Sequence, residues 1–551
     1  MTAVFDGGSV IICAGQGVAG SCARCAVRRR KALHSGRRDV GDQTAHTAAE
    51  DRLVAAVLSA VLERGLPDDT LVRQVRPAVP AVTDHRLIRD PGCEVCGEDG
   101  EPSYDPVPRT PRPVLQGRFR LTDLRGAGAV PLLRCSDEEF GVTSNLVRHH
   151  PTTFPSVSAS VPLGLDGAAD RGYGRALDSC DAEVVAVAEA LERRAARHHR
   201  DAAAVASSAQ LGDRAFDVSS LGLPVGPQGF PYQRLTPDVE LAWVTAWSAG
   251  QDRLVLVPRS VAYYQSWATG ADQPVLQETS SGCAVGSCLE EAVLHALVEV
   301  VERDAVITAW YARTPLPEVD LTTVTDPELR VLITRMRTRS GYDLRAFWAT
   351  RDIAVPVFWV VATAPPGQPD LPAIVCASGA APCPAGALRG GLLELAAALD
   401  HRRASWPGDP EQRHRAARML QDPGLVQDIT DHGLLYCHPD TVPRWNFLLG
   451  HGAMRPWREF AKSRRPSRGD LLLDCRALVQ ETLARCADVL VVDQTTVEHT
   501  TAELRCVKVL VPGAVPITFG HNARRVLGIP RLDAALTASA RALTSHPHPF
   551  Q

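Results

Sequence analysis

Two stretches of the chain repeat the string Glu-x-x-Glu-Arg inside runs that are otherwise almost wholly apolar, VVAVAEALERRAA and AVLHALVEVVERDAV. The repeated positions are Glu189, Glu192 and Arg193 in the first run and Glu299, Glu302 and Arg303 in the second. Residues three and four apart share one face of a helix, so each copy directs two carboxylates and a guanidinium the same way. In the second copy this stripe continues backwards through His295 to Glu291.

Carboxylates among apolar residues are costly to bury, and a hard divalent cation is the usual compensation. Magnesium commonly lies between carboxylates and nucleotide phosphates, so we expect a magnesium-nucleotide site. The alternative is two solvated helices whose Glu and Arg form weak surface ion pairs. Two copies in matching apolar settings favour the site, because a solvated face needs no apolar flanks.

The elements around these helices predict a mixed α+β protein. Residues 48–66 have helical periodicity, and apolar runs typical of strands occur at 10–13, 254–257, 355–361, 489–493 and 504–511. A connector with five prolines, EPSYDPVPRTPRPV at 101–114, separates a first unit from the rest. We therefore predict two domains, residues 1–115 and 116–551, with the 110-residue offset of the Glu-x-x-Glu-Arg helices as the sign of a duplicated half.

Four cysteines in two Cys-x-x-Cys pairs lie near the two ends of the first unit: Cys22 and Cys25, Cys93 and Cys96. Four thiolates complete a closed tetrahedral zinc shell, which is structural because no position stays open. A redox dithiol is the alternative, but that chemistry needs one pair rather than two.

The composition is that of an ordinary globular protein, with 45% hydrophobic residues and a net charge of −4. No basic excess indicates a nucleic-acid partner, and we find neither a signal peptide nor a stretch long enough to cross a bilayer. Fifteen cysteines without an export signal fit a reducing cytoplasm.

Three further features bear on a nucleotide site. The loop SSGCAVGS at 280–287, which ends in Ser287, precedes the second carboxylate helix and can present backbone N–H groups to an anion. Arg389 lies beside Gly390 and Gly391 and is either a phosphate clamp or part of a helix-surface salt bridge. The pair His149 and His150 lacks metal-ligand spacing to acidic residues, so we assign it to the surface.

These residues resemble a family, the YcaO proteins, and within it the D component of azoline-forming cyclodehydratases. The similar stretches are RGYGRA with AEALERRA, SSGCAVGSCLEEAVLHALVEVVERDAV, ALRGGLLE, VLVVDQT, VLVPGAVPITFGHNARR and the PHPF-containing end. The resemblance implies an α+β fold in which an ATP-binding domain of duplicated helix/strand halves follows a small zinc-binding α/β domain, a partial ThiF-like docking unit.

The resemblance also implies a site. ATP and Mg²⁺ are held by Glu189, Glu192, Ser287, Glu291, Glu299, Glu302, Arg303 and Arg389, with Glu189, Glu192, Glu299 and Glu302 as metal ligands. A docked chain end with Pro547, Pro549 and Gln551 is implied to position the catalytic base. The sequence departs from the family pattern at several places, among them Ser287, where asparagine is frequent, and Gln551, where a third spaced proline is expected.

The implied activity is ATP-dependent cyclodehydration of Cys, Ser or Thr residues in a ribosomally made precursor peptide, as in thiopeptides and related azole peptides. Thioamide or amidine formation and a non-catalytic docking scaffold stay open as alternatives. The expected partners are the precursor peptide, a separate ThiF-like leader-binding protein, a flavin-dependent azoline dehydrogenase and a second copy in a homodimer. Nucleic acid and membranes are not expected partners.

Overall fold

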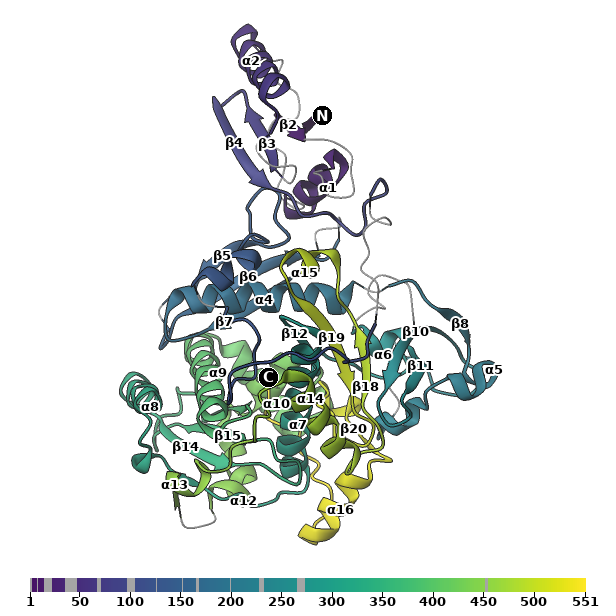
Figure 1. Ribbon diagram of the computed structural model, residues 1–551. Coiled ribbons are helices and arrows are strands. Elements are labelled where there is room, and N and C mark those ends of the chain that lie inside the picture. The colour runs from purple at the N-terminus through teal and green to yellow at the C-terminus, as the bar shows by residue number, and fades with distance from the viewer. Residues whose placement is uncertain are drawn as a thin grey trace.

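The computed structural model describes residues 2–6, 8–13, 22–34, 47–66, 71–96, 105–124, 126–150, 152–164, 168–198, 200–226, 232–264, 273–450 and 454–551. Figure 1 shows an N-terminal unit that projects from one end of a larger body, in which the chain also ends.

The N-terminal unit is an antiparallel sheet in the order β1 (Thr2–Asp6), β2 (Ser9–Cys13), β3 (Leu71–Arg76) and β4 (Ala81–Arg86). Strand β2 is buried along its whole length because both faces of the sheet are covered. One face packs against α1 (Ala23–His34) and the cysteine pairs, and the other packs against α2 (Ala48–Arg64). The expected strand at 10–13 and helix at 48–66 are confirmed.

Two units of the larger body share one plan, three antiparallel strands followed by a helix that covers them. In the first, β5 (Ser144–Arg148), β6 (Ser156–Pro162) and β7 (Ala169–Arg175) lead into α4 (Ser179–Arg197). In the second, β14 (Asp343–Trp348), β15 (Val357–Thr363) and β16 (Ile374–Ala380) lead into α9 (Pro384–Ser405). In each unit the last strand carries glycine where it meets its helix, because an added Cβ would come within 2.4 Å of helix backbone at Gly174 and at Gly379.

A larger sheet lies between these units, with the strand order β11 (Arg253–Pro258), β10 (Glu240–Ser248), β18 (Leu490–Asp493), β19 (Arg505–Leu510) and β12 (Cys283–Gly286); β8 (Ala204–Ser207) pairs with β10. Helix α7 (Leu289–Tyr311) follows β12 and packs between this sheet and β15–β16 in the main core. Its long buried surface explains why this helix is apolar nearly all round. The strands expected at 254–257, 355–361, 489–493 and 504–511 are confirmed, with ends shifted by one or two residues.

Shorter elements complete the body. They are α3 (Val130–Leu133), α5 (Ser208–Leu211), β9 (Leu223–Pro224), α6 (Arg259–Ala262), β13 (Val319–Asp320), α8 (Pro327–Ser340), α10 (Pro410–Gln421), α11 (Ile429–Leu435), α12 (Asn446–Leu449), β17 (Arg455–Pro456), α13 (Trp457–Phe460), α14 (Leu471–Leu483), α15 (Val497–Thr501), β20 (Arg525–Leu527) and α16 (Pro530–Ser539).

Candidate ATP and metal sites

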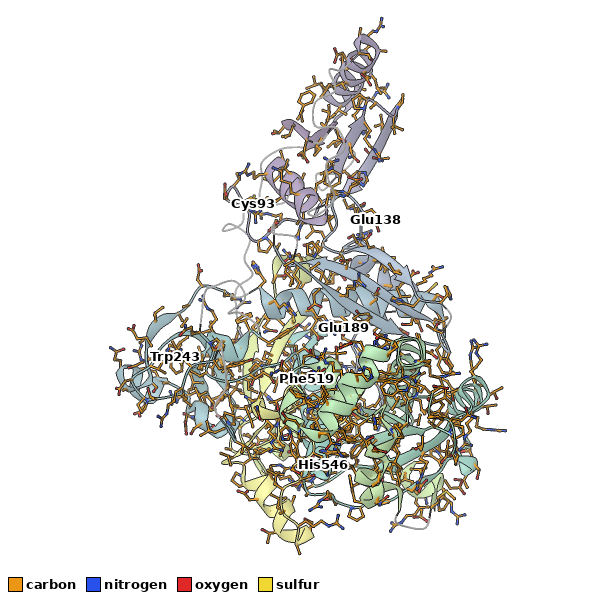
Figure 2. All side chains as sticks on the ribbon, turned by 180° about the vertical axis from the view of Figure 1, so that it is seen from behind. Cys93, Glu138, Glu189, Trp243, Phe519 and His546 are labelled. Atoms are coloured by element: carbon orange, nitrogen blue, oxygen red, sulfur yellow. The ribbon has the colours of Figure 1, made fainter. Side chains whose placement is uncertain are left out.

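A cavity of about 1250 Å³ lies where α4, α7 and α9 approach one another. Its wall includes Glu189 and Glu192 from α4, Glu299 from α7 and Glu394 from α9. The loop before β12 and the last two residues of the chain also contribute to it. Figure 2 labels Glu189 and Phe519, which both line this cavity. Two helices that are 110 residues apart in the sequence thus direct their carboxylates to one place.

Hydrogen bonds fix the first carboxylate of each Glu-x-x-Glu-Arg copy. The N–H of Tyr173 donates to Glu189 Oε2 at 2.6 Å, and Arg193 Nη2 donates to Glu189 Oε1 at 2.7 Å. The equivalent Glu299 accepts from the Gly282 N–H at 3.3 Å and lies 3.5 Å from Arg303 Nη2. Each copy therefore pairs its arginine with the glutamate four residues before it.

Glu302 lies beside the cavity and is joined to it by two lining residues, Ser378 and Arg303. Its Oε1 accepts hydrogen bonds from Ser378 Oγ and from Arg303 Nη1, both at 2.6 Å. Arg303 also donates to Ser378 Oγ at 3.0 Å, which closes a triangle of contacts. This triangle holds the guanidinium between the carboxylates of α7 and Ser378 of β16.

The remaining carboxylates repel one another. Burial raises the pKa of Glu192 well above its ordinary value, and the charges of Glu299 and Glu189 raise it further. Burial also raises the pKa of Glu299, with a further rise from Glu302, although Arg303 opposes both. The pKa of Glu394 is raised by burial as well. A cluster of this kind is poised to accept a cation, since a positive charge would favour the ionised forms.

Three residues that the resemblance implies at the nucleotide lie elsewhere. Glu291 is buried and accepts from Arg120 Nη1 at 3.1 Å and from the Leu121 N–H at 2.9 Å. The hydroxyl of Ser287 is also buried, and neither residue lines the cavity. Arg389 forms an ion pair with Glu328 at 2.8 Å, with both side chains about two-fifths exposed. This is the helix-surface salt bridge that the sequence leaves open.

The end of the chain is docked inside the body. The Tyr436 hydroxyl donates to the carbonyl of Pro547, and Cys376 Sγ lies 3.8 Å from that of Pro549. Arg402 Nε donates to the side-chain Oε1 of Gln551 at 2.9 Å. Phe550 and Gln551 line the cavity. The three positions that we assign to the docked end thus lie at or next to the carboxylate cavity.

Several cavity residues are not anticipated by the sequence. Ser378, inside β16, has no local signal that distinguishes it from any other strand residue. Glu394 does not fit the Glu-x-x-Glu-Arg pattern. It lies on the helix of the second sheet-and-helix unit, and this repeat is recognisable only once the fold is known. His149 and His150 line the cavity as well, from the surface position that we assign to them, with His149 half-buried and His150 exposed. Tertiary packing brings these residues to the cavity, and the spacing of residues along the chain does not reveal such packing.

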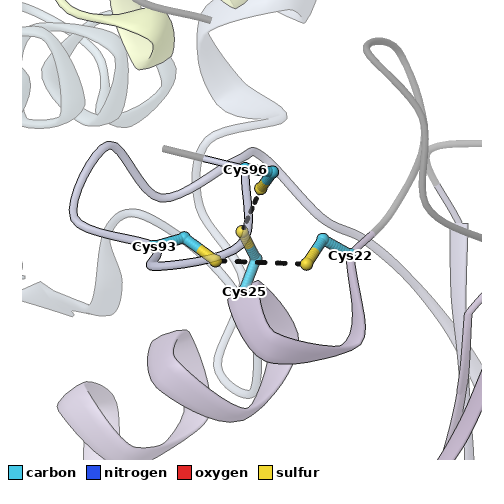
Figure 3. Close-up of side chains that lie close together, drawn as sticks. All are labelled: Cys22, Cys25, Cys93 and Cys96. Atoms are coloured by element: carbon cyan, nitrogen blue, oxygen red, sulfur yellow. Dashed lines mark hydrogen bonds between the residues drawn. The ribbon is translucent and has the colours of Figure 1, made fainter. Parts of the chain in front are cut away.

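A second cluster joins the two cysteine pairs of the N-terminal unit. All four Sγ atoms lie within 4.8 Å of one another, with Cys22 and Cys93 at 4.0 Å and Cys25 and Cys96 at 3.3 Å (Figure 3). A tetrahedral zinc shell places its sulfurs about 3.8 Å apart, from a Zn–S bond of about 2.3 Å. Burial raises the pKa of the Cys25 thiol, and a bound cation would favour its thiolate.

Among the described residues, no helix has both the length and the apolar character that a membrane crossing requires.

Known proteins share parts of this chain and its fold. A protein from the tfuA 3' region of Rhizobium leguminosarum bv. trifolii is 27% identical over 51% of this chain and 63% of its own length. A protein from Methanothermobacter thermautotrophicus is 29% identical over 30% of this chain and 41% of its own. The matches thus span less than two thirds of either relative.

Among solved structures, a heterocyclase in complex with substrate and cofactor superimposes with a TM-score of 0.68 at 19% identity, covering 98% of this chain and 76% of that one. The heterocyclase TruD gives a TM-score of 0.56 at 18% identity, covering 92% and 69%. At such identities these two likenesses establish the fold alone. Residues 173–515, which include α4, α7 and α9, match the family described as YcaO cyclodehydratase, ATP- and Mg²⁺-binding, and this chain therefore belongs to the YcaO family.

Proposed function

We propose that this protein is an ATP-dependent cyclodehydratase that converts Cys, Ser or Thr residues of a ribosomally made precursor peptide into thiazolines or oxazolines. The convergence of Glu189, Glu192, Glu299 and Glu394 from three helices on one cavity supports this proposal most directly. At about 1250 Å³ the cavity is larger than the usual small-molecule or cofactor site of about 300–1,000 Å³, which suits a nucleotide together with part of a peptide.

The residues present fit magnesium. Its preferred ligands are oxygens, and the raised pKa values of Glu192 and Glu299 identify carboxylates that lack sufficient positive charge around them. Glu189, Glu192, Glu299 and Glu302 would hold the ion, with Glu302 reaching it from beside the cavity. When bound, magnesium supplies neutralising charge to the phosphate groups of the nucleotide.

The chemistry of the peptide explains the need for ATP. The side chain of Cys, Ser or Thr attacks the carbonyl carbon of the preceding residue, and its proton passes to a base. The resulting five-membered ring carries an oxygen that is a poor leaving group. Transfer of the γ-phosphoryl group to this oxygen allows it to depart as phosphate when the ring nitrogen loses its proton. The products are the azoline, ADP and phosphate.

This chain's own residues would position the reactants. Arg303, fixed by Glu302 and Ser378, is the guanidinium placed to stabilise charge on the transferring phosphoryl group. Gln551 is anchored through Arg402, while the Pro547 and Pro549 carbonyls accept hydrogen bonds from the body. We assign to the docked end the role of positioning, next to the peptide, the base that accepts the proton.

For the N-terminal unit we propose structural zinc bound by Cys22, Cys25, Cys93 and Cys96. The unit, residues 1–115, would serve as a partial ThiF-like docking domain beside the cyclodehydratase domain, residues 116–551. Zinc analysis of the purified chain should give about one ion per chain, as a single four-thiolate shell requires. Cys93→Ser should lose it, whereas Cys180→Ser, at an exposed cysteine outside the cluster, should retain it.

We place the protein in the cytoplasm, with a precursor peptide, a ThiF-like leader-binding protein and a flavin-dependent azoline dehydrogenase as partners, and with self-association as a homodimer. A thiopeptide or another azole peptide is the product class that we favour. Genes next to this one that encode a short Cys/Ser/Thr-rich peptide and such proteins would identify the substrate.

The decisive experiment incubates the protein, its precursor peptide and the ThiF-like partner with ATP and Mg²⁺. We expect peptide-stimulated release of phosphate and a loss of one water mass per modified residue in the mass spectrum. Replacement of oxygen by sulfur would identify a thioamide-forming enzyme instead. Absence of nucleotide binding at millimolar ATP with the partner present would favour a docking scaffold.

A further inference from the structure

One of the three lysines of the chain, Lys508, is fully buried on β19. Its ammonium donates to the carbonyl oxygens of Thr279 at 2.8 Å and Ser281 at 2.7 Å, and it lies 3.2 Å from Glu278 Oε2. These three contacts use all the donors that an ammonium has. A compact point charge suits this arrangement, whereas the planar fork of arginine does not.

Balancing Glu278 does not by itself explain this lysine. Arg525 Nη1 already contacts Glu278 Oε1 at 2.6 Å, and both of these side chains are about 5% exposed. Burial acts to raise the pKa of Glu278, but Arg525 and Lys508 outweigh it, so the carboxylate is held in its ionised form. The triad of Lys508, Glu278 and Arg525 therefore carries one net positive charge inside the protein, which is costly unless further negative groups face it.

The two carbonyls that bind Lys508 belong to the loop that lines the cavity. Thr279, Ser280 and Ser281 are in the cavity wall, whereas Lys508 is not. The pairing of β12 with β19 places Cys283 directly opposite Lys508, so the side chain of Lys508 reaches back to the loop that precedes β12.

Gly282, which lies between this loop and β12, is held from two sides. The carbonyl of Gly282 accepts from the Val509 N–H at 2.8 Å, and its own N–H donates to Glu299 Oε2 at 3.3 Å. Gly282 has φ of +82°, and a Cβ there would lie 2.4 Å from the carbonyl oxygen of Val509. Lys508 thus draws two carbonyl oxygens of the loop to itself, while the next N–H group faces a carboxylate of the cavity.

We propose that Lys508 is a positioning residue for the nucleotide: it turns the carbonyls of the 279–281 loop away from the phosphates and brings a buried positive charge beside Glu299. This inference rests on the proposed function, and it names the triphosphate end of the cavity as the part that Lys508 serves. Without the lysine, carbonyl oxygens are free to turn toward the phosphate groups, which they repel.

The test compares Lys508→Met, Lys508→Arg and the double variant Lys508→Met/Glu278→Gln with wild type, using Lys462→Met at an exposed lysine as the control. MgATP binding is measured by the nucleotide-induced rise in melting temperature, and KM for ATP and kcat are measured by phosphate release. The first readout does not depend on turnover. Nucleotide-free melting temperatures report whether each variant is folded.

We expect Lys508→Met to weaken MgATP binding and raise KM for ATP by about 10–100-fold, the range typical of supporting residues around metal sites, with a smaller change in kcat. Lys508→Arg should rescue only part of this loss because its fork cannot reproduce both carbonyl contacts. The double variant removes one charge of each sign, so it should recover the nucleotide-free melting temperature while its ATP affinity stays low. Lys462→Met should match wild type.

Three outcomes overturn the inference. They are unchanged ATP affinity in a folded Lys508→Met protein, recovery of ATP affinity together with stability in the double variant, and full activity of Lys508→Arg. If Lys508→Met does not fold, the double variant decides. A wild-type protein that binds MgATP but forms no azoline would refute the proposed reaction alone, whereas one that binds no nucleotide would refute both.

Discussion

At the scale of single residues, the cavity is an arrangement of unequal carboxylates. Glu189 has its own arginine, and Glu302 has both an arginine and a hydroxyl. Glu192 faces the charges of Glu189 and Glu299, which raise its pKa beyond the rise that burial causes. The carboxylate with the strongest need of a cation is thus Glu192, the second glutamate of the Glu-x-x-Glu-Arg string on α4.

Glu192→Gln should stabilise the metal-free protein and inactivate it. When folding raises the pKa of a carboxyl group, the group's contribution to the free energy of unfolding is fully present below the pKa of the unfolded chain. This contribution is lost as pH rises through the pKa of the folded protein. In a chelator, the melting temperature of wild type should therefore fall as pH rises above the usual glutamate range, and the variant should show less of this fall. With Mg²⁺ and peptide, turnover should decrease at least about 100-fold.

The matched control is Glu183→Gln on the same helix, where the carboxylate pairs with the exposed Arg148. It should leave both the pH dependence and turnover close to wild type, as is usual for surface pairs. Equal Mg²⁺-induced stabilisation of wild type and Glu192→Gln would contradict metal binding by Glu192.

Arg303 and Arg389 provide a second comparison between residues. Arg303→Lys keeps the charge but removes the planar guanidinium, whose Nη1 contacts Glu302 and Ser378 while Nη2 faces Glu299. We therefore expect kcat to decrease about 10²–10³-fold, as when one preorganised donor is lost. Arg389→Lys affects an exposed pair with Glu328 and should leave kcat unchanged. Steady-state phosphate release checks both variants, and a large loss in Arg389→Lys would return that residue to the nucleotide.

At the scale of elements, close contact between a strand and a helix sets where the carboxylates of α4 lie. A Cβ at Gly174 of β7 would lie 1.7 Å from the carbonyl oxygen of Ala182, and one at Gly172 would lie 2.2 Å from that of Ala186. Glycine at both positions therefore lets α4 approach the strand closely. The same device recurs at Gly379 of β16 beneath α9.

Gly174→Ala should displace α4 from its strand, because the new methyl group meets helix backbone rather than a flexible side chain. We expect a loss of about 1–3 kcal/mol in the free energy of unfolding, as for other overpacked sites, together with weaker MgATP binding. Gly390→Ala on α9 is the control, since its Cβ would meet nothing within 4 Å. That variant should gain about 0.5–1 kcal/mol, because alanine favours the helix. Denaturant titration and nucleotide-induced thermal shifts measure both effects.

At the scale of the whole molecule, the N-terminal unit is joined to the body by a buried ion cluster. Glu498 of α15 is fully buried and accepts from Arg29 of α1 at 2.9 Å and from Arg194 of α4 at 3.0 Å. Burial acts to raise the pKa of Glu498, but the two arginines outweigh it and hold the pKa far below its usual value. The helix that begins at the cysteine cluster and the helix that bears Glu189 thus share one carboxylate.

Glu498→Gln should cost about 3–5 kcal/mol, because it removes the carboxylate that contacts two buried guanidinium groups and leaves Asp90 as their nearby negative charge. A depressed pKa gives stability that is present above the unfolded pKa and lost as pH falls through the folded one, so the cost should shrink in acid. Glu94→Gln, at an exposed pair with Arg24, should cost less than about 1 kcal/mol. Denaturant titrations at several pH values separate the two, and equal costs would contradict the role of the buried cluster.

Much of this architecture is predictable from the sequence, and the predictions that do not hold have physical reasons. Helical spacing correctly places Glu189, Glu192 and Glu299 on faces that meet in one cavity. It also places Glu291 on the stripe of Glu299, yet eight residues separate the two by about 12 Å along the axis, too far for one metal ion. Periodicity identifies the face of a helix but not which of its turns opposes a partner.

The strip of chain at 105–121, which connects the two units, lies against the first turns of α7. Glu290, only 2% exposed, accepts from the N–H groups of Arg109 and Thr110, and the carbonyl of Arg112 accepts from the Leu471 N–H. This segment is therefore fixed to the body by hydrogen bonds and does not act as a free linker. A fragment that begins at residue 116 would lack the N–H groups that donate to Glu290, so we expect it to fold poorly. A fragment that begins at residue 105 would keep these donors. Protease digestion of the two fragments would reveal the difference.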